Sequence, residues 1–332
     1  MSDGIFFDAK NAKGAKERKV DAPVLIVGQG LAGTLLGWEL ERAGREFVIA
    51  DAGHEGAASR VGAGLVNPVT GERWATAPGW AEKAAVARAT YARMAEAWGV
   101  AGGFVSDIRI RRTWRDAAEA EHVRGRVERG ALAPWVSAAG LEDDAAWIEG
   151  AWRVDLPGLI AAGRARWAAC GRLRETRVTQ AEAAAWPGPV VWCVGAAETA
   201  VPELRAVGGE TLELAVSGAG WREDVARHDG VWVLPVSAGR AWAGASFVRD
   251  EAERAARREA LRASVTRQLA DLEWTETAVL AGWRMTTPDR TPRSGWLPGH
   301  EGRRGGVNGL GSKGGLLAPG LAKAWAERLC AM

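Results

Sequence analysis

The stretch VLIVGQGLAGTLLGWELERAGREFVIAD, residues 24–51, constrains the fold more than any other part of the chain. It begins with an apolar run, residues 24–28, that predicts a buried parallel strand. Leucine and tryptophan side chains then recur at helical spacing as far as Gly44, a residue typical of a helix C-terminus. Residues 47–50 predict a second buried strand, and Asp51 follows it. This order of strand, glycine turn, helix and strand is typical of a dinucleotide-binding unit.

The glycine turn has a spacing, Gly28-x-Gly30-x-x-Gly33, that suits a pyrophosphate. The first glycine permits a tight turn, the second lets the backbone approach the phosphates, and the third lets the helix pack closely on the strand. The helix N-terminus adds free N–H groups and a positive dipole. The predicted nucleotide contacts in this unit are Gly28, Gly30, Leu31, Ala32, Gly33 and Asp51.

Asp51 narrows the choice of dinucleotide. A carboxylate at this position accepts hydrogen bonds from ribose hydroxyls and repels a 2′-phosphate, so NADP is disfavoured. The unit by itself leaves FAD and NAD open, and a glycine-rich turn without a ligand is the remaining alternative.

The composition excludes several classes of function. The chain has 332 residues, 47% of them apolar and 25% charged, which suits a globular protein with two domains or with one domain and an inserted lobe. Its net charge of +2 argues against nucleic acid or a membrane surface as the main partner. The longest uncharged stretch in the glycine-turn unit, residues 24–38, is too short to span a bilayer.

The N-terminus and the cysteines indicate a reducing compartment. Residues 1–20 are polar and lack the apolar core of a secretory signal, so we expect a flexible tail and a cytoplasmic protein. Cys170, Cys193 and Cys330 lie far apart without C-x-x-C spacing, which predicts neither a disulfide framework nor a metal site.

Hydrophobic periodicity predicts the remaining elements. Apolar residues recur every three or four positions where we expect helices, and alternate or run together where we expect strands. The expected elements are helices at 80–98, 157–171 and 252–273, strands at 104–115, 172–179, 190–195, 211–216, 231–236 and 241–248, a connecting loop at 139–145, and a glycine-rich loop at 306–320 that runs into a last helix.

Three further stretches carry a resemblance to a known family. They are ASRVGAGLVNPVTGERW (58–74), AGWRMTTPDRTPRSGWLPG (281–299) and NGLGSKGGLLAPGLA (308–322). With the glycine-turn unit and VVWCVGA, they resemble the D-amino-acid oxidase superfamily of flavoproteins, which includes glycine oxidase, sarcosine oxidase and the oxidase half of a bifunctional tRNA-modifying enzyme. The resemblance runs from about residue 23 to about residue 329.

The resemblance implies a fold and a cofactor. The fold class is α/β with an α+β second lobe, in which a Rossmann-like FAD-binding domain is interleaved with an antiparallel-sheet substrate domain. We expect the FAD-binding domain to comprise residues 21–79, 150–205 and 281–332, and the substrate domain residues 80–149 and 206–280. The implied activity is that of an FAD-dependent amine or amino-acid oxidoreductase, which oxidises a carbon–nitrogen bond next to a carboxylate by hydride transfer to flavin N5.

The resemblance also implies cofactor contacts outside the glycine turn. Val178 stands where the family's backbone meets the adenine, and Gly195 ends the strand that packs near the nucleotide. The segment that passes the flavin comprises Ser59, Arg60, Gly62, Ala63, Gly64 and Leu65, and the loop beside the flavin pyrimidine edge comprises Gly309, Leu310, Gly311, Ser312, Lys313 and Gly314.

The chain departs from the family pattern in places. Arg284 stands at the arginine of the family's G-x-R-P motif, which binds flavin or the substrate carboxylate, but Met285 replaces the proline. Leu310 replaces a histidine of the C-terminal loop, and the chain's one tyrosine leaves few of the family's substrate-framing tyrosines. No cysteine lies near that loop, so we expect noncovalent FAD.

The candidate catalytic residues are Arg284, Lys313 and Arg60. Arg284 would anchor a carboxylate bidentately, and the alternative is a surface arginine. Lys313 precedes a predicted helix, where it would add positive charge near reduced flavin or bind the carboxylate, and the alternative is a solvated lysine. Arg60 and Arg73 are weaker candidates for the pocket. We assign no role to His54, His122, His228 or His300.

These residues predict a small anionic amine or amino-acid substrate. Two other hypotheses remain at this point: a flavin-binding protein without catalysis, and an NAD-dependent dehydrogenase. A role in tRNA modification is not expected, because the chain lacks a methyltransferase half and a basic excess.

Overall fold

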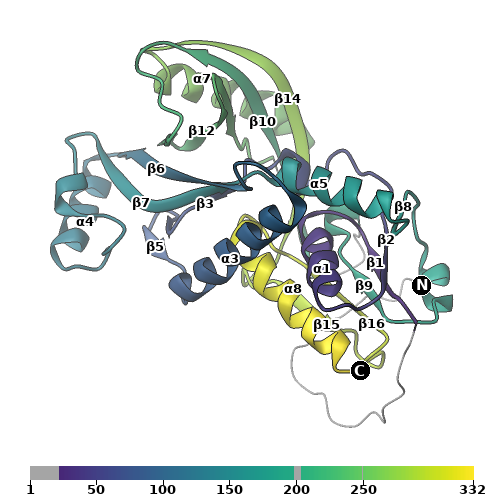
Figure 1. Cartoon of the computed structure of the whole chain (residues 1–332). Helices are drawn as coiled ribbons and strands as arrows, with labels where there is room; N and C mark the ends of the chain where they lie inside the picture. Colours follow the sequence, from purple (N-terminus) through teal and green to yellow (C-terminus); the bar gives the residue numbers. More distant parts are fainter. Residues whose placement is uncertain (1–21, 198–202, 249) are drawn as a thin grey trace.

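The computed structural model describes residues 22–197, 203–248 and 250–332, and most of its strands belong to two large sheets (Figure 1). The six-stranded sheet contains, in spatial order, β15 (Arg293–Trp296), β16 (Arg304–Asn308), β9 (Val190–Trp192), β1 (Val24–Val27), β2 (Phe47–Ala50) and β8 (Leu173–Arg174). Its neighbouring strands are parallel except β15 and β16. All four residues of β1 are buried, as expected for a central strand of a parallel sheet.

Helices cover this sheet. The helix α1 (Leu31–Arg42) follows the glycine turn, and the long C-terminal helix α8 (Gly314–Cys330) packs beside it and beside α3 (Trp80–Trp98) (Figure 1). The helix α5 (Leu156–Ala169) also contacts α1. Apolar side chains from these helices and from β1, β2, β9 and β16 form the largest hydrophobic core.

The second sheet has eight strands and is strongly curved in Figure 1. Its spatial order is β14 (Glu273–Thr286), β10 (Arg205–Ser217), β13 (Arg240–Gly244), β12 (Val231–Ser237), β11 (Val225–Asp229), β6 (Val105–Thr113), β7 (Ala145–Val154) and β3 (Leu65–Val66). The pair β11–β6 is parallel and the other pairs are antiparallel, so this sheet is mixed rather than fully antiparallel.

The helix α7 (Arg254–Gln268) packs against β11, β12 and β13 at the top of Figure 1. The other named elements are α2 (Ala58–Val61), α4 (Ala117–Glu128), α6 (Gln180–Ala185), β4 (Val69–Thr70) and β5 (Ala75–Thr76). No helix of the described residues is long and apolar enough to cross a membrane.

Several predicted boundaries were wrong. The strand expected at 172–179 is confined to β8, because only Leu173 and Arg174 pair with β2. The helix expected at 252–273 ends at Gln268, since the chain turns there to enter β14. Residues 306–320 are not one loop. β16 continues to Asn308 and α8 begins at Gly314, which leaves residues 309–313 as the loop.

The expected division into two domains stays a prediction. Three of its boundaries, at 149/150, 205/206 and 280/281, fall inside β7, β10 and β14. The expected tail at residues 1–20 lies outside the described residues.

Candidate active site

A cavity of about 1270 Å³ brings most of the predicted site residues together. It is lined by the glycine turn, by the segment through α2, by the loop before α8, and by strands of the eight-stranded sheet. The predicted site residues that line it are Gly28, Gly30, Leu31, Ala32, Asp51, Ser59, Arg60, Gly62, Ala63, Gly64, Leu65, Val178, Gly195, Arg284, Leu310, Gly311, Ser312, Lys313 and Gly314. Residues from the N-terminal and C-terminal parts of the chain thus line the same cavity.

Three of the residues proposed for the site, Gly33, Gly309 and Arg73, do not line this cavity. A Cβ on Gly309 would come within 2.9 Å of Thr287 Cγ2. Arg73 is exposed at the surface and is not part of the pocket.

The glycine turn has the geometry of a phosphate cradle. Gly28 has a φ of +98°, and a Cβ on Gly33 would lie only 1.9 Å from the carbonyl oxygen of Gly28. No larger residue fits either position. Gly30 is the N-cap of α1 and provides no side chain to cap the helix. The first N–H groups of α1 therefore remain available to an anion, which fits a dinucleotide pyrophosphate.

Asp51 lies at the end of β2 and is held in place by hydrogen bonds. Its carboxylate accepts from the backbone N–H of Gln29 at 2.8 Å and of Gly53 at 2.8 Å. Arg164 donates to the same carboxylate at 3.2 Å, and Arg60 lies 4.0 Å from it. Asp51 is thus fixed beside the glycine turn, and Arg60 lies at this nucleotide end of the cavity.

A second helix N-terminus faces the same cavity. Lys313 is the N-cap of α8 without a capping side-chain bond, and a Cβ on Gly314 would lie 3.3 Å from Leu31 Cδ2. The N-termini of α1 and α8 therefore lie next to each other. Their dipoles and the Lys313 ammonium make this region favourable for negative charge.

Arg284 projects from β14 into the cavity without an ionic partner. No carboxylate of the described residues forms an ion pair or hydrogen bond with it. Its guanidinium carbon lies 4.6 Å from the ring centroid of Phe247, which also lines the cavity. Burial lowers the pKa of Arg284. A half-buried arginine without a counterion among the described residues is suited to bind an anionic ligand.

A further group of cavity residues, on the eight-stranded sheet and α4, was not predicted from the sequence. His228 is paired in register with Trp232 on one side and with Arg112 on the other, and all three line the cavity. The His228 and Trp232 rings have centroids 4.0 Å apart. Arg112 is buried and donates to Glu119 at 2.8 Å. These four residues form no sequence motif, because each comes from a different element: Arg112 from β6, Glu119 from α4, His228 from β11 and Trp232 from β12.

The cysteines are poorly placed to bond a flavin covalently. Cys193 lines the cavity, but burial raises the pKa of its thiol to about 12, which suppresses the nucleophilic thiolate. Cys170 and Cys330 are exposed and lie outside the cavity lining. This arrangement agrees with noncovalent FAD.

Comparison with known sequences identifies similar proteins along nearly the whole chain. The sequence model of a family described as FAD dependent oxidoreductase matches residues 23–328. A Rhizobium etli protein named as a thiamine biosynthesis oxidoreductase, ThiO, is 30% identical over 333 residues, covering 92% of this chain and 96% of that protein.

Comparison with solved structures identifies the same fold. Glycine oxidase from Geobacillus kaustophilus is similar with a TM-score of 0.72 and 22% identity, covering 92% of this chain and 94% of that one. Iminodiacetate oxidase from Chelativorans sp. BNC1 is similar with a TM-score of 0.71 and 22% identity, covering 93% of this chain and 95% of that one.

Proposed function

The chain belongs to the FAD-dependent oxidoreductase family, and from this premise we propose that it oxidises the carbon–nitrogen bond of a small anionic amino acid or N-substituted amino acid by hydride transfer to flavin N5. The family fixes FAD as the cofactor, which the glycine turn alone left open against NAD, and it fixes the class as an enzyme acting on amino acids or amines. The proposal concerns the substrate and the residues that bind it.

The observation that carries the proposal is the unpaired Arg284. Its guanidinium is positively charged in the cavity and has no carboxylate partner among the described residues. A bidentate pair of charge-assisted hydrogen bonds to a substrate carboxylate would satisfy it. Two such bonds also fix the rotation of the substrate, so that one hydrogen of the α-carbon faces the cofactor.

FAD supplies the acceptor for the hydride when it is bound. Residues that line the cavity would bind this cofactor and stabilise the charge that develops on it. The N–H groups at the start of α1 would hold the pyrophosphate, and Asp51 the ribose hydroxyls. Lys313 and the N-terminus of α8 would stabilise negative charge that develops during the reaction. We assign Arg60 to cofactor binding rather than catalysis, because it lies beside Asp51.

The relatives support a small substrate. The similar solved structures are named for oxidases of glycine and iminodiacetate, and the similar Rhizobium protein for thiamine biosynthesis. The first two substrates are small and carry a carboxylate on the carbon next to nitrogen, which is the group that we propose Arg284 binds.

The test measures flavin bleaching under anaerobic conditions with a panel of amino acids and N-substituted glycines, each beside its amide. We expect at least one carboxylate to bleach the wild-type protein. In steady-state turnover with an added electron acceptor, replacing Arg284 with alanine should raise the Michaelis constant for that substrate at least about tenfold, because charge-assisted hydrogen bonds are lost. The flavin absorbance per chain should remain that of the wild type.

The uncharged amide provides the matched comparison. If the amide and the acid react with equal kinetics, or if Arg284→Ala leaves the Michaelis constant unchanged, Arg284 does not bind a carboxylate.

A further inference from the structure

Phe247 has an unusual conformation for an aromatic residue. Its side chain is 45% exposed, and it has a φ of +50°, in the left-handed region that few residues other than glycine adopt. It also lines the cavity. A phenylalanine gains little from being exposed and loses energy at positive φ. Such a combination persists where the surrounding structure imposes it, which is common at functional sites.

The backbone around Phe247 is fixed to β10 on both sides. Ser246 donates its N–H to the carbonyl of Glu210 at 3.1 Å, and its hydroxyl accepts from the N–H of Glu210 at 2.9 Å. Val248 donates to the carbonyl of Gly208 at 2.8 Å, and Gly208 donates to Val248 at 3.1 Å. The backbone of Phe247, which lies between Ser246 and Val248, is therefore held in place by β10.

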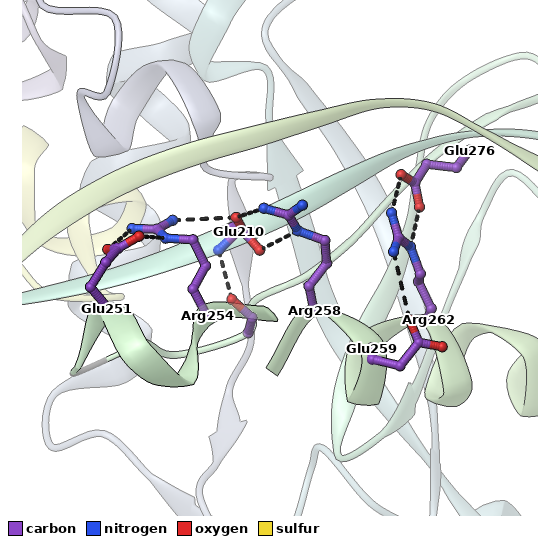
Figure 2. Close-up of polar contacts among 8 residues, drawn as sticks. Glu210, Glu251, Arg254, Arg258, Glu259, Arg262 and Glu276 are labelled. Atoms are coloured by element: carbon purple, nitrogen blue, oxygen red, sulfur yellow. Dashed lines mark hydrogen bonds and ion pairs between the residues drawn. The ribbon is translucent and has the colours of Figure 1, made fainter. Parts of the chain in front are cut away.

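Glu210 of β10 is in turn linked to α7 by ion pairs (Figure 2). Glu210 is 1% exposed and accepts hydrogen bonds from Arg258 at 2.5 and 2.9 Å and from Arg254 at 3.3 Å. Arg254 also bonds to Glu251 (Figure 2). The hydrogen bonds from Arg258 lower the pKa of Glu210, so the carboxylate stays charged and the link between helix and strand persists at neutral pH.

We propose that Phe247 is a positioning residue for substrate binding: its ring supports one face of the Arg284 guanidinium, 4.6 Å from the ring centroid, and directs the N–H edge of that guanidinium into the cavity. The inference rests on the proposed role of Arg284. A guanidinium that stacks through its face on an aromatic ring keeps its in-plane N–H groups free to donate to a carboxylate.

The contact explains how Arg284 is ordered before a substrate arrives. An arginine side chain has many rotamers, and holding it still when a carboxylate binds would weaken that binding. The described residues offer Arg284 no acidic partner that would hold it, and such a partner would compete with the substrate. An aromatic ring orders the side chain without neutralising its charge.

The test measures binding of glycolate, which has the carboxylate of glycine without its amine, to the FAD-loaded protein, with the dissociation constant read from the flavin absorbance. Leucine at position 247 keeps an apolar side chain and the same restriction on φ, but it has no aromatic face. We expect Phe247→Leu to raise the dissociation constant about five-fold to thirty-fold, the range for a partly desolvated cation–π pair. Phe247→Tyr, which keeps the ring, should remain within about two-fold of the wild type.

Uncharged glycolamide separates positioning from simple packing. Its affinity should be the same for Phe247→Leu and for the wild type. If Phe247→Leu binds glycolate like the wild type, or weakens glycolate and glycolamide equally, Phe247 does not act through Arg284. Phe247→Met, a second apolar variant without a ring, replaces Phe247→Leu if the leucine variant loses its flavin.

Arg284→Gln, measured in parallel, separates this inference from the proposed function. If Arg284→Gln loses glycolate binding while Phe247→Leu keeps it, only the role of Phe247 is wrong. If Arg284→Gln binds glycolate as tightly as the wild type, or if the wild type does not bind it, the carboxylate site itself is wrong.

Discussion

The His228 imidazole is half-buried against the Trp232 indole, and its buried Nδ1 has no hydrogen-bond partner among the described residues. Burial is the main cause that lowers the pKa of His228 to about 4, and the positive charge of Arg112 adds to it, while Asp229 and Glu119 oppose it. In the folded protein this ring therefore stays neutral at physiological pH. In the unfolded chain it would titrate near its usual pKa of about 6.5.

This difference predicts a pH-dependent contribution to stability. Between about pH 6.5 and pH 4 the unfolded chain binds the proton and the folded protein does not, so acidification favours unfolding. His228→Phe keeps an aromatic ring but cannot be protonated. The wild-type free energy of unfolding, relative to that of His228→Phe, should fall by up to about 3 kcal/mol from pH 7 to pH 4. Denaturant unfolding at several pH values measures it, and parallel curves for the two proteins would contradict it.

At the scale of elements, the link between α7 and β10 depends on one buried carboxylate. Glu210 is buried between the two elements and receives charged hydrogen bonds from Arg254 and Arg258. Glu210→Gln would leave these arginines facing a neutral amide. We expect it to lower the free energy of unfolding by about 2 kcal/mol, because a charged hydrogen-bonding partner is lost in a buried site.

Glu253→Gln, at the N-cap position of α7, is the matched control. Glu253 pairs with Arg257, and both side chains are about half exposed, at 48% and 53%. An exposed pair of this kind contributes about 0.5 kcal/mol or less. Equal effects of the two substitutions in thermal or denaturant unfolding would show that the Glu210 link does not stabilise the fold.

The elements also show which parts of the fold were readable from the sequence. The unit from β1 to β2 was predicted correctly because strand, turn, helix and strand follow one another locally. In contrast, β7 was missed, since its ladder partner β6 lies far along the chain and its apolar residues do not alternate. The helix α4 was missed because charged residues cover much of its surface.

The candidate site also combines residues that stand in local motifs with residues that are positioned by distant parts of the chain. The glycines and Arg284 stand in recognisable motifs, so the sequence named them. Phe247 and His228 acquire their positions from strand pairing and from a turn at positive φ, neither of which leaves a local pattern. Motifs therefore mark the residues that we expect to contact the cofactor, whereas the residues that shape the rest of the cavity have no such motif.

At the scale of the whole molecule, the cavity is lined by residues of both large sheets. A ligand that binds only the folded protein stabilises it, by about 2.7 kcal/mol at a concentration one hundred times its dissociation constant. We therefore expect excess FAD to raise the unfolding temperature and to slow amide hydrogen exchange in β1 and in β12 alike. If exchange slows in β1 but not in β12, the cofactor does not couple the two sheets.

The order of strands in the six-stranded sheet has a consequence for biosynthesis. β1 begins at Val24, whereas β16, two places away across β9, ends at Asn308. A ribosome must therefore translate as far as residue 308 before this sheet has all six of its strands. The nascent polypeptide cannot complete the cavity until Leu316, the last residue that lines it, has been translated, so full enclosure of the cofactor waits for that stage of synthesis.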